Sequence, residues 1–142
     1  MGNRAVITIR DDYAPKPKWN SLYLHWNGGR DQVEAFLHVA KLYGIRCSDS
    51  SYGIARLAQL IGNTIGGTLS LGVGSYGRLD VDNYDNGTYI IDKWEIVERE
   101  YFEGKEQSNY DFDKLVKQIR KVNDPIFNYG FVNEISNQSM RS

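Results

Sequence analysis

The spacing of apolar residues along the chain predicts three helices. Between residues 31 and 43, and again between 52 and 65, apolar side chains recur three and four positions apart, which places them on one helix face. Gly44 stands where a glycine commonly ends a helix. A third helix is expected over 111–123, and Pro125 should end it because proline has no N–H to donate. The first two apolar stripes consist of Val33, Phe36, Leu37 and Ala40, and of Ile54, Leu57, Ala58, Ile61 and Ile65.

Alternation of apolar and polar residues predicts the strands. Asn86-Gly87 lies between two such segments, 78–82 and 88–91, and Asn-Gly is the strongest short-range signal for a β-hairpin turn. We therefore expect an α+β fold: a mostly antiparallel sheet of about five or six strands, two central helices on one face, and a further C-terminal helix. The predicted strands cover residues 3–9, 20–26, 68–73, 78–82, 88–91 and 94–99.

Length and composition indicate one domain. A chain of 142 residues with 41% hydrophobic and 25% charged residues is typical of a single globular unit, which we place at residues 1–132. The polar segment 133–142 is expected to fray. The sequence shows no secretory leader and no membrane-spanning run, and its single cysteine, Cys47, fits a reducing compartment. These features predict a cytoplasmic protein without a membrane partner.

Charge and aromatic content narrow the kinds of partner. The net charge is −1, so no overall field attracts DNA or RNA, and an anionic ligand would need a local cluster of positive residues. Aromatic residues make up 13% of the chain, and ten of them are tyrosines. Such an excess is typical of interfaces, although tyrosine also populates strands. We expect a homo-oligomer, at least a dimer.

The junction between residues 22 and 37 is the most specific functional signal. An apolar run ends at Asn27-Gly28-Gly29, Arg30 follows, and a predicted helix begins at once. Glycines let backbone N–H groups approach a ligand, a helix N-terminus presents free donors, and arginine adds a fixed positive fork. Together these are the ingredients of a phosphate or carboxylate cradle. The alternative is a plain strand-to-helix turn, with Asp31 and Glu34 forming a capping box.

The sequence offers no catalytic or metal-binding constellation. His25 is a candidate general base, but a lone histidine at a strand end is more often structural. Cys47 follows a helix C-terminus, which is the wrong end of the helix dipole for activating a thiol. The aspartate-rich run 80–87 lacks the oxygen ligands and the glutamate that a calcium loop needs. We therefore predict no catalytic residue, no bound metal and no cofactor.

Two further groups of residues suit a nucleotide. Tyr84 and Asn86, near the expected hairpin tip, combine a stacking surface with an amide that reads a base edge. Arg56, Gln59 and Asn63 form a polar stripe on the second helix, for which a solvated face is the default interpretation. Arginine, amides and aromatic rings without acid–base pairs are suited to holding a nucleotide and not to cutting one.

Four blocks of the sequence follow one another in an order typical of one protein family. They are Gly2-Asn3-Arg4-Ala5-Val6-Ile7, Leu22-Tyr23-Leu24-His25-Trp26-Asn27-Gly28-Gly29-Arg30, Tyr52-Gly53-Ile54-Ala55-Arg56-Leu57, and Leu79-Asp80-Val81-Asp82-Asn83-Tyr84-Asp85-Asn86-Gly87 followed by Trp94-Glu95-Ile96. Through these blocks, over residues 2–99, the chain resembles a family of small phage and prophage proteins, the first-named Thoeris anti-defence proteins.

The resemblance implies a protein that binds and sequesters an immune signal without cleaving it. Members of this family bind cyclic ADP-ribose isomers made by bacterial TIR-domain proteins, and some also bind cyclic oligonucleotides at separate sites. Their ligands lie at subunit contacts of a symmetric homo-oligomer, in the cytoplasm of the infected host. The residues that we expect to bind ligand here are Trp26, Asn27, Gly28, Gly29, Arg30, Arg56, Asn63, Tyr84 and Asn86.

Two other classes of function stay open at this point. The first is an enzyme that degrades such a nucleotide, using His25 and an aspartate of the 80–85 run. The second is an inhibitor that blocks a host protein through its aromatic surface. Recovery of intact ligand from heat-denatured protein would separate sequestration from degradation.

Overall fold

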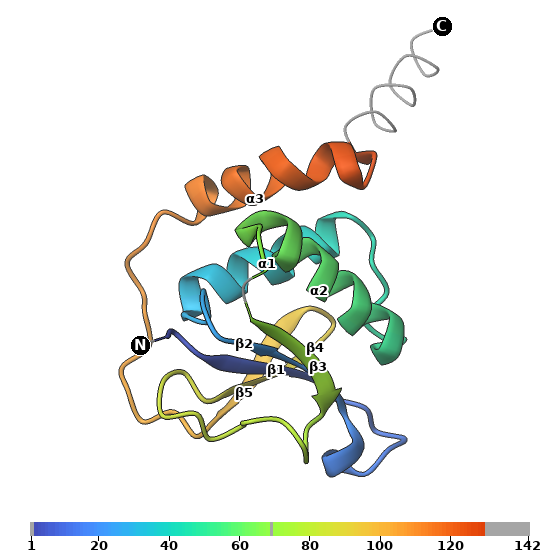
Figure 1. The fold of residues 1–142 in the computed structure, drawn as a ribbon, viewed down its shortest axis with the longest axis vertical. Coiled ribbons are helices and arrows are strands. Elements are labelled where there is room, and N and C mark those ends of the chain that lie inside the picture. The colour runs from blue at the N-terminus through green and yellow to red at the C-terminus, as the bar shows by residue number, and fades with distance from the viewer. Residues whose placement is uncertain (1, 69, 130–142) are drawn as a thin grey trace, which may run out of the picture.

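A five-stranded sheet and three helices form the structure, a computed structural model that describes residues 2–68 and 70–129. The predicted boundary at residue 132 and the predicted tail 133–142 lie outside these described residues. Figure 1 shows α1 and α2 packed on one face of the sheet and α3 packed above them. The elements are β1 (Ala5–Ile9), η1 (Lys16–Lys18), β2 (Asn20–Leu24), α1 (Arg30–Leu42), α2 (Ser50–Ile65), β3 (Leu71–Ser75), β4 (Thr88–Asp92), β5 (Glu95–Glu100) and α3 (Phe112–Ile126).

The sheet confirms the predicted α+β class. Its strand order is β3-β2-β1-β4-β5, and every pair is antiparallel except β1 with β4. All five residues of β1 are buried, because α1 and α2 cover one face and the 76–87 segment covers part of the other. On that second face the Thr88 hydroxyl donates to the carbonyl of Val81 (3.0 Å). A strand buried on both faces is rich in apolar residues, as Ala5–Ile9 is. Its one polar residue, Thr8, is buried and its hydroxyl accepts from the hydroxyl of Ser21 (2.7 Å).

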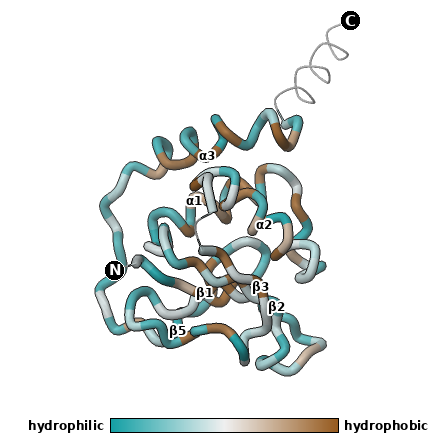
Figure 2. The backbone as a smooth tube through the Cα atoms, viewed as in Figure 1, coloured by the Kyte–Doolittle hydropathy of each residue, from teal (hydrophilic) through white to brown (hydrophobic). Residues whose placement is uncertain are grey.

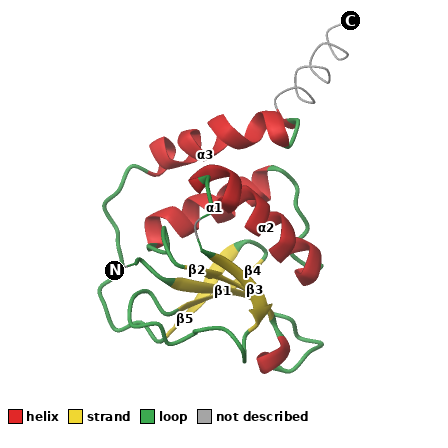
Figure 3. Ribbon diagram, viewed as in Figure 1, coloured by secondary structure: helices red, strands yellow, loops and turns green. Residues whose placement is uncertain are grey.

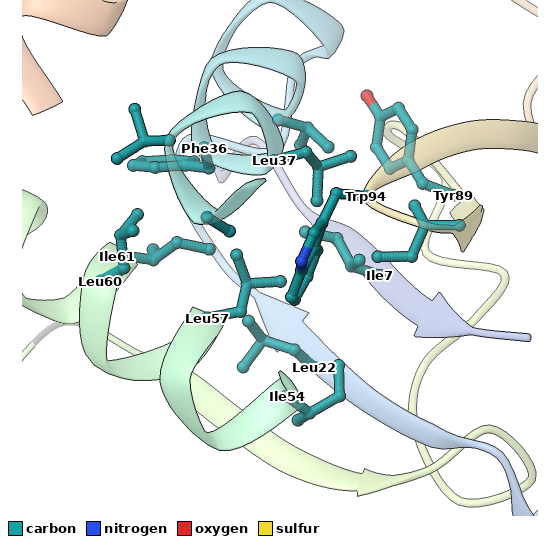
Figure 4. Packing of buried hydrophobic residues seen from close by; sticks show 14 of the residues in the cluster. Ile7, Leu22, Phe36, Leu37, Ile54, Leu57, Leu60, Ile61, Tyr89 and Trp94 are labelled. Atoms are coloured by element: carbon teal, nitrogen blue, oxygen red, sulfur yellow. The ribbon is translucent and has the colours of Figure 1, made fainter. Parts of the chain in front are cut away.

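The core lies between the sheet and the first two helices. Figure 2 shows hydrophobic stretches, in brown, where the sheet and the first two helices lie together. Figure 4 shows Leu57 of α2 among Leu22, Ile54 and the ring of Trp94. Leu57 is completely buried, as its place on the predicted stripe requires. The indole N–H of Trp94 donates to the carbonyl of Ile45 (2.6 Å), so this ring is satisfied as well as buried.

The predicted hairpin at Asn86-Gly87 is wrong. Residues 78–82 form no strand, and the 76–87 segment is a loop that leads into β4. Asn83 organises its end, because the amide oxygen accepts from the N–H of Gly87 (2.9 Å) and the amide nitrogen donates to the carbonyl of the same residue (2.9 Å). The hairpin of this region is instead β4–β5, turned by Lys93 and Trp94 at φ of 53° and 62°.

Two predicted helix ends also need correction. No capping box forms, because α1 begins at Arg30 with Gly29 as its N-cap and Asp31 already inside the helix. Pro125 does not end α3 at residue 123: the helix continues to Ile126, with the proline in its last turn, and Phe127 caps it. A proline so close to the end removes one backbone hydrogen bond and leaves the preceding turns intact. Gly44 follows α1 with a φ of 72°, which confirms the predicted stop.

Leu57→Asp tests the predicted phase of α2. The carboxylate would be buried without a partner, and we expect a loss of roughly 4 kcal/mol or more in the free energy of unfolding. The melting temperature should fall by about 10 °C or more. The matched control is Arg56→Asp, which puts the same side chain on the exposed neighbouring position and should melt close to the parent protein. Equal melting of the two variants would overturn the assignment of the buried face.

Candidate functional site

A small cavity lies at the N-terminal end of α1, and we call it the Arg99 cavity. Its volume is about 180 Å³. Segments far apart in the sequence meet there: the chain before β1, the start of α1, the ends of β4 and β5, and the loop between β5 and α3, which Figure 3 shows as the long connection on the side of the N-terminus. The lining residues are Asn3, Gly29, Arg30, Asn86, Tyr89, Arg99, Phe102, Lys105, Glu106 and Gln107.

The two glycines before α1 play different parts. Gly28 is packed against β1, where a Cβ would lie 2.5 Å from the carbonyl oxygen of Asn3 and 2.7 Å from the Cβ of Ala5. Its N–H donates to the Asn3 carbonyl (2.9 Å) and its carbonyl accepts from the hydroxyl of Tyr89 (2.8 Å). Gly29 instead lines the cavity, and a Cβ there would meet the side chains of Asp31 and Gln107. Gly28 therefore fixes the turn, and Gly29 leaves the approach open.

The first N–H groups of α1 are occupied by side chains of the protein itself. The N–H of Asp31 donates to the Oε1 atom of Gln107 (3.0 Å), and the N–H of Gln32 donates to the Oδ1 atom of Asp31 (2.8 Å). These donors sit at the positive end of the helix dipole, where a carboxylate or phosphate oxygen is favoured. The N–H of Asp31, a donor of the predicted cradle, is therefore already bonded to Gln107, and whether an anion replaces this side chain stays a prediction.

Arg30 and Arg99 place two guanidinium groups beside these donors. Arg30 is paired with Glu34 one helical turn on (2.7 Å) and with Glu106. Arg99 reaches the same Glu106 and donates to the carbonyl of Asn86 (2.8 Å). The carboxylate of Glu106 therefore bridges two arginines, with Oε2 toward Arg30 and Oε1 toward Arg99.

Arg99 is the most enclosed charge of the cavity. Its side chain is only 12% exposed, and its guanidinium lies between two aromatic rings, 3.9 Å from the centre of Tyr89 and 4.0 Å from that of Phe102. Its Nε atom is buried without a hydrogen-bond partner among residues 2–68 and 70–129. A buried donor without a partner is unfavourable, and such a group is satisfied when a ligand oxygen reaches it.

A tyrosine holds the second carboxylate at the rim. The hydroxyl of Tyr110 donates to Glu34, and burial together with this bond raises the pKa of Tyr110 to about 12. The hydroxyl therefore stays protonated and keeps Glu34 turned to one side of Arg30. Arg30 also borders a larger pocket of about 350 Å³ between α1, β5 and α3, whose walls include Leu37, Trp94 and Phe112.

The structure brings three of the predicted ligand residues together. Gly29, Arg30 and Asn86 all line the Arg99 cavity, and Gly28 lies directly behind it. Asn27 has a left-handed backbone (φ 63°) in the turn, and Trp26, 38% exposed, stacks edge-on against His25.

The other three predicted residues lie elsewhere. Tyr84 borders a pocket of about 440 Å³ whose walls include Asp82, Asp85 and Glu103. These carboxylates disfavour an anionic ligand there. On α2, Asn63 donates to Asn123 of α3 (3.1 Å), so it joins two helices. Arg56 donates to Gln59 (2.8 Å) at the surface. None of the three lines the Arg99 cavity.

Sequence reasoning missed most of the far wall of the cavity. Arg99 stands in a charged strand end between Glu98 and Glu100, where it reads as a surface residue. Glu106 and Gln107 belong to a polar loop that carries no motif. The only local signal was an arginine three residues before Phe102. This spacing is too common in sequences to identify a binding residue.

His25 and Cys47, the two side chains considered for catalysis, have surroundings that are typical of structural residues. The Nδ1 atom of His25 is 2.9 Å from the hydroxyl of Tyr23, and burial raises the pKa of the Cys47 thiol. Within the described ranges, no group of three His, Cys, Asp or Glu side chains is arranged to hold a metal ion. In the same part of the chain, no helix combines the length and apolar content needed to cross a membrane.

No protein-family model, curated protein or solved structure matches the chain.

The loop that carries Asn86 should respond to acid. Asp85 accepts from the Nε and N–H of Arg4 (2.8 and 3.0 Å), and these bonds lower the pKa of its carboxyl below that of a free aspartate. A lowered folded-state pKa stabilises the protein at a pH above the pKa of the unfolded chain, and this stabilisation is lost as the pH falls through the folded-state pKa. Asp85→Asn should therefore melt about 2–4 °C below the parent at neutral pH, with the gap closing as the pH falls below the ordinary pKa of aspartate, about 3.9. Asp82→Asn on the same loop is the control, and a gap that persists in acid would contradict the assignment.

Proposed function

We propose that the protein binds a cyclic nucleotide immune signal of the cyclic ADP-ribose class and sequesters it without cleavage, in the cytoplasm of a phage-infected bacterium. The observation that carries the proposal is the Arg30–Arg99 pair at the start of α1. Two guanidinium groups and a third cation on Lys105 line one cavity, and the N–H of Asp31 at the start of α1 donates to Gln107 of the same lining. Such a set recognises phosphate oxygens by charge-assisted hydrogen bonds.

The aromatic surfaces suit the remainder of such a ligand. The pocket that shares Arg30 with the Arg99 cavity is lined by Leu37, Trp94, Ile96 and Phe112 together with the charged Glu34, Lys41 and Glu95, and the ring of His38 lies edge-on to Phe112 at 5.3 Å. Because Arg30 borders both spaces, the apolar part of this lining is offered to the base of a nucleotide whose phosphate is held at Arg30. The resemblance over residues 2–99 names the same class of ligand, and it covers Asn3, Gly29, Arg30 and Asn86 of the cavity wall.

The size of the cavity favours a shared site. Small-molecule sites usually measure about 300–1,000 Å³, whereas the Arg99 cavity measures about 180 Å³. It fits the phosphate groups of a nucleotide and leaves the rest to the neighbouring pocket or to a second copy of the chain. We therefore also propose a symmetric homo-oligomer, consistent with the aromatic excess of the sequence.

One experiment separates sequestration from its alternatives. The protein is mixed with a cyclic ADP-ribose isomer, freed of unbound ligand, heat-denatured, and its supernatant is analysed by chromatography. Intact ligand in amounts close to one per site is the expected result. A new product would identify an enzyme. Absence of any nucleotide together with a co-purified host protein would identify an inhibitor of a host component.

Arg30→Ala tests the binding residues directly. Loss of its charge-assisted bonds should weaken binding of the retained cyclic ADP-ribose isomer by about 1.5–3 kcal/mol, or roughly 10- to 150-fold, by isothermal titration calorimetry. The matched control is Arg78→Ala, an exposed arginine in the loop after β3 that does not line the Arg99 cavity. If both variants bind as tightly as the parent, residues 27–29 are only a turn. Circular dichroism confirms that each variant is folded before its affinity is compared.

A further inference from the structure

We propose that Glu106 is an internal competitor of the ligand: its carboxylate occupies the place between Arg30 and Arg99 that a ligand phosphate takes, and it is displaced on binding. This inference rests on the proposed function for the identity of the natural ligand. The displacement itself follows from the geometry of the cavity and applies to any anion that carries paired phosphate oxygens.

Glu106 bridges Arg30 and Arg99 in the way that a ligand with two phosphates would. One carboxylate oxygen accepts from Arg30 and the other from Arg99, which is how a pyrophosphate would use its two ends. The neighbouring Gln107 repeats the pattern, because its Oε1 atom accepts from the N–H of Asp31 at the helix start (3.0 Å). Two consecutive side chains of one loop thus supply acceptor oxygens to the donors of the cradle.

The attachment of the loop also supports displacement of Glu106. Within the described chain, every hydrogen bond that a side chain of residues 103–109 makes is accepted from Arg30, Arg99 or the N–H of Asp31. The segment 103–109 is therefore held by the same donors that a ligand requires, while Phe102 and Tyr110 anchor its two ends. A ligand that takes the donors releases the segment between these two anchors.

The unpartnered Nε atom of Arg99 favours the displacement as well. Glu106 satisfies the Nη1 atom and the Asn86 carbonyl satisfies Nη2, yet Nε stays buried without a partner in the described part of the chain. The N–H of Nε is parallel to an N–H of Nη2, so it lies on the edge of the guanidinium away from the Nη1 atom that Glu106 occupies. A ligand with several phosphate oxygens offers acceptors to both edges, whereas the single carboxylate of Glu106 reaches one, and this difference favours the exchange.

A competitor lowers apparent affinity by the fraction of sites that it keeps closed. Glu106→Gln removes the negative charge and keeps the size of the side chain. We expect this variant to bind inorganic pyrophosphate about 10-fold or more tightly than the parent by calorimetry. Without pyrophosphate it should melt below the parent, because Arg99 then lacks its counter-ion, and saturating pyrophosphate should restore the melting temperature.

The matched control is Glu103→Gln, an exposed glutamate of the same connection that does not line the Arg99 cavity. It changes the net charge equally and should bind pyrophosphate within about twofold of the parent. Equal gains in both variants would show a general charge effect and overturn the proposal. If Glu106→Gln binds pyrophosphate no more tightly than the parent, the proposal is also overturned, because Glu106 would then be a structural or ligand-contacting residue.

A measurement on the parent protein does not depend on the folding of a variant. Limited trypsin digestion with and without pyrophosphate should show faster cleavage after Lys105 in the bound state, and amide hydrogen exchange should be slower at residues 30–33. A loop that becomes more protected on binding would contradict displacement. The cyclic ADP-ribose titration is read separately. If pyrophosphate releases the loop but the nucleotide does not bind, the proposed sequestration is refuted and the competitor role of Glu106 is supported. If the nucleotide binds but the loop is not released, sequestration is supported and the competitor role is refuted.

Discussion

The hydrogen bond from Tyr89 to Gly28 holds the candidate site to the core. Tyr89 is completely buried in β4, and its hydroxyl donates to the carbonyl of Gly28 at 2.8 Å. Burial raises the pKa of this phenol, so it remains a donor. In Figure 4 its hydroxyl oxygen points away from the apolar cluster, while its ring lies beside it. One side chain thereby fixes the turn that starts α1 and, through its ring 3.9 Å from Arg99, the far wall of the cavity.

That arrangement places Arg99 at the cavity but removes most of the water around its charge, which costs free energy. A guanidinium that is nearly buried between two rings loses most of its hydration, and cation–π contact with Tyr89 and Phe102 replaces only part of it. Glu106 supplies the counter-charge in the free protein. The ion pair thus stabilises the fold with the same group that, in the proposed competition, opposes ligand binding, a conflict between stability and activity that is common at functional sites.

The sequence predicts the helices and the glycine–arginine junction because those signals are local. Apolar spacing identifies α1 and α2, and Gly44 marks a stop within reach of its own helix. The predicted hairpin fails because Asn-Gly serves equally well in a loop that Asn83 organises, while the real turn uses Lys93 and Trp94. Burial of the Trp94 indole outweighs the poor turn propensity of these two residues. Glu106 lies 76 positions from Arg30, and no local pattern reports such a contact.

Competition inside the cavity also bears on which anions bind. A monovalent anion offers Arg30 and Arg99 no more than the Glu106 carboxylate already does, and it lacks the tether that gives Glu106 a high effective concentration. A ligand must therefore bring several phosphate oxygens, in an arrangement that spans both guanidinium groups, to gain more than it displaces. Chloride and monocarboxylates fail that requirement. A ligand with adjacent phosphates meets it, and the side chains of Trp94 and Phe112 would add a contact that inorganic pyrophosphate does not make. Under the proposed competition, selectivity arises from Glu106, the acidic residue that occupies the cavity.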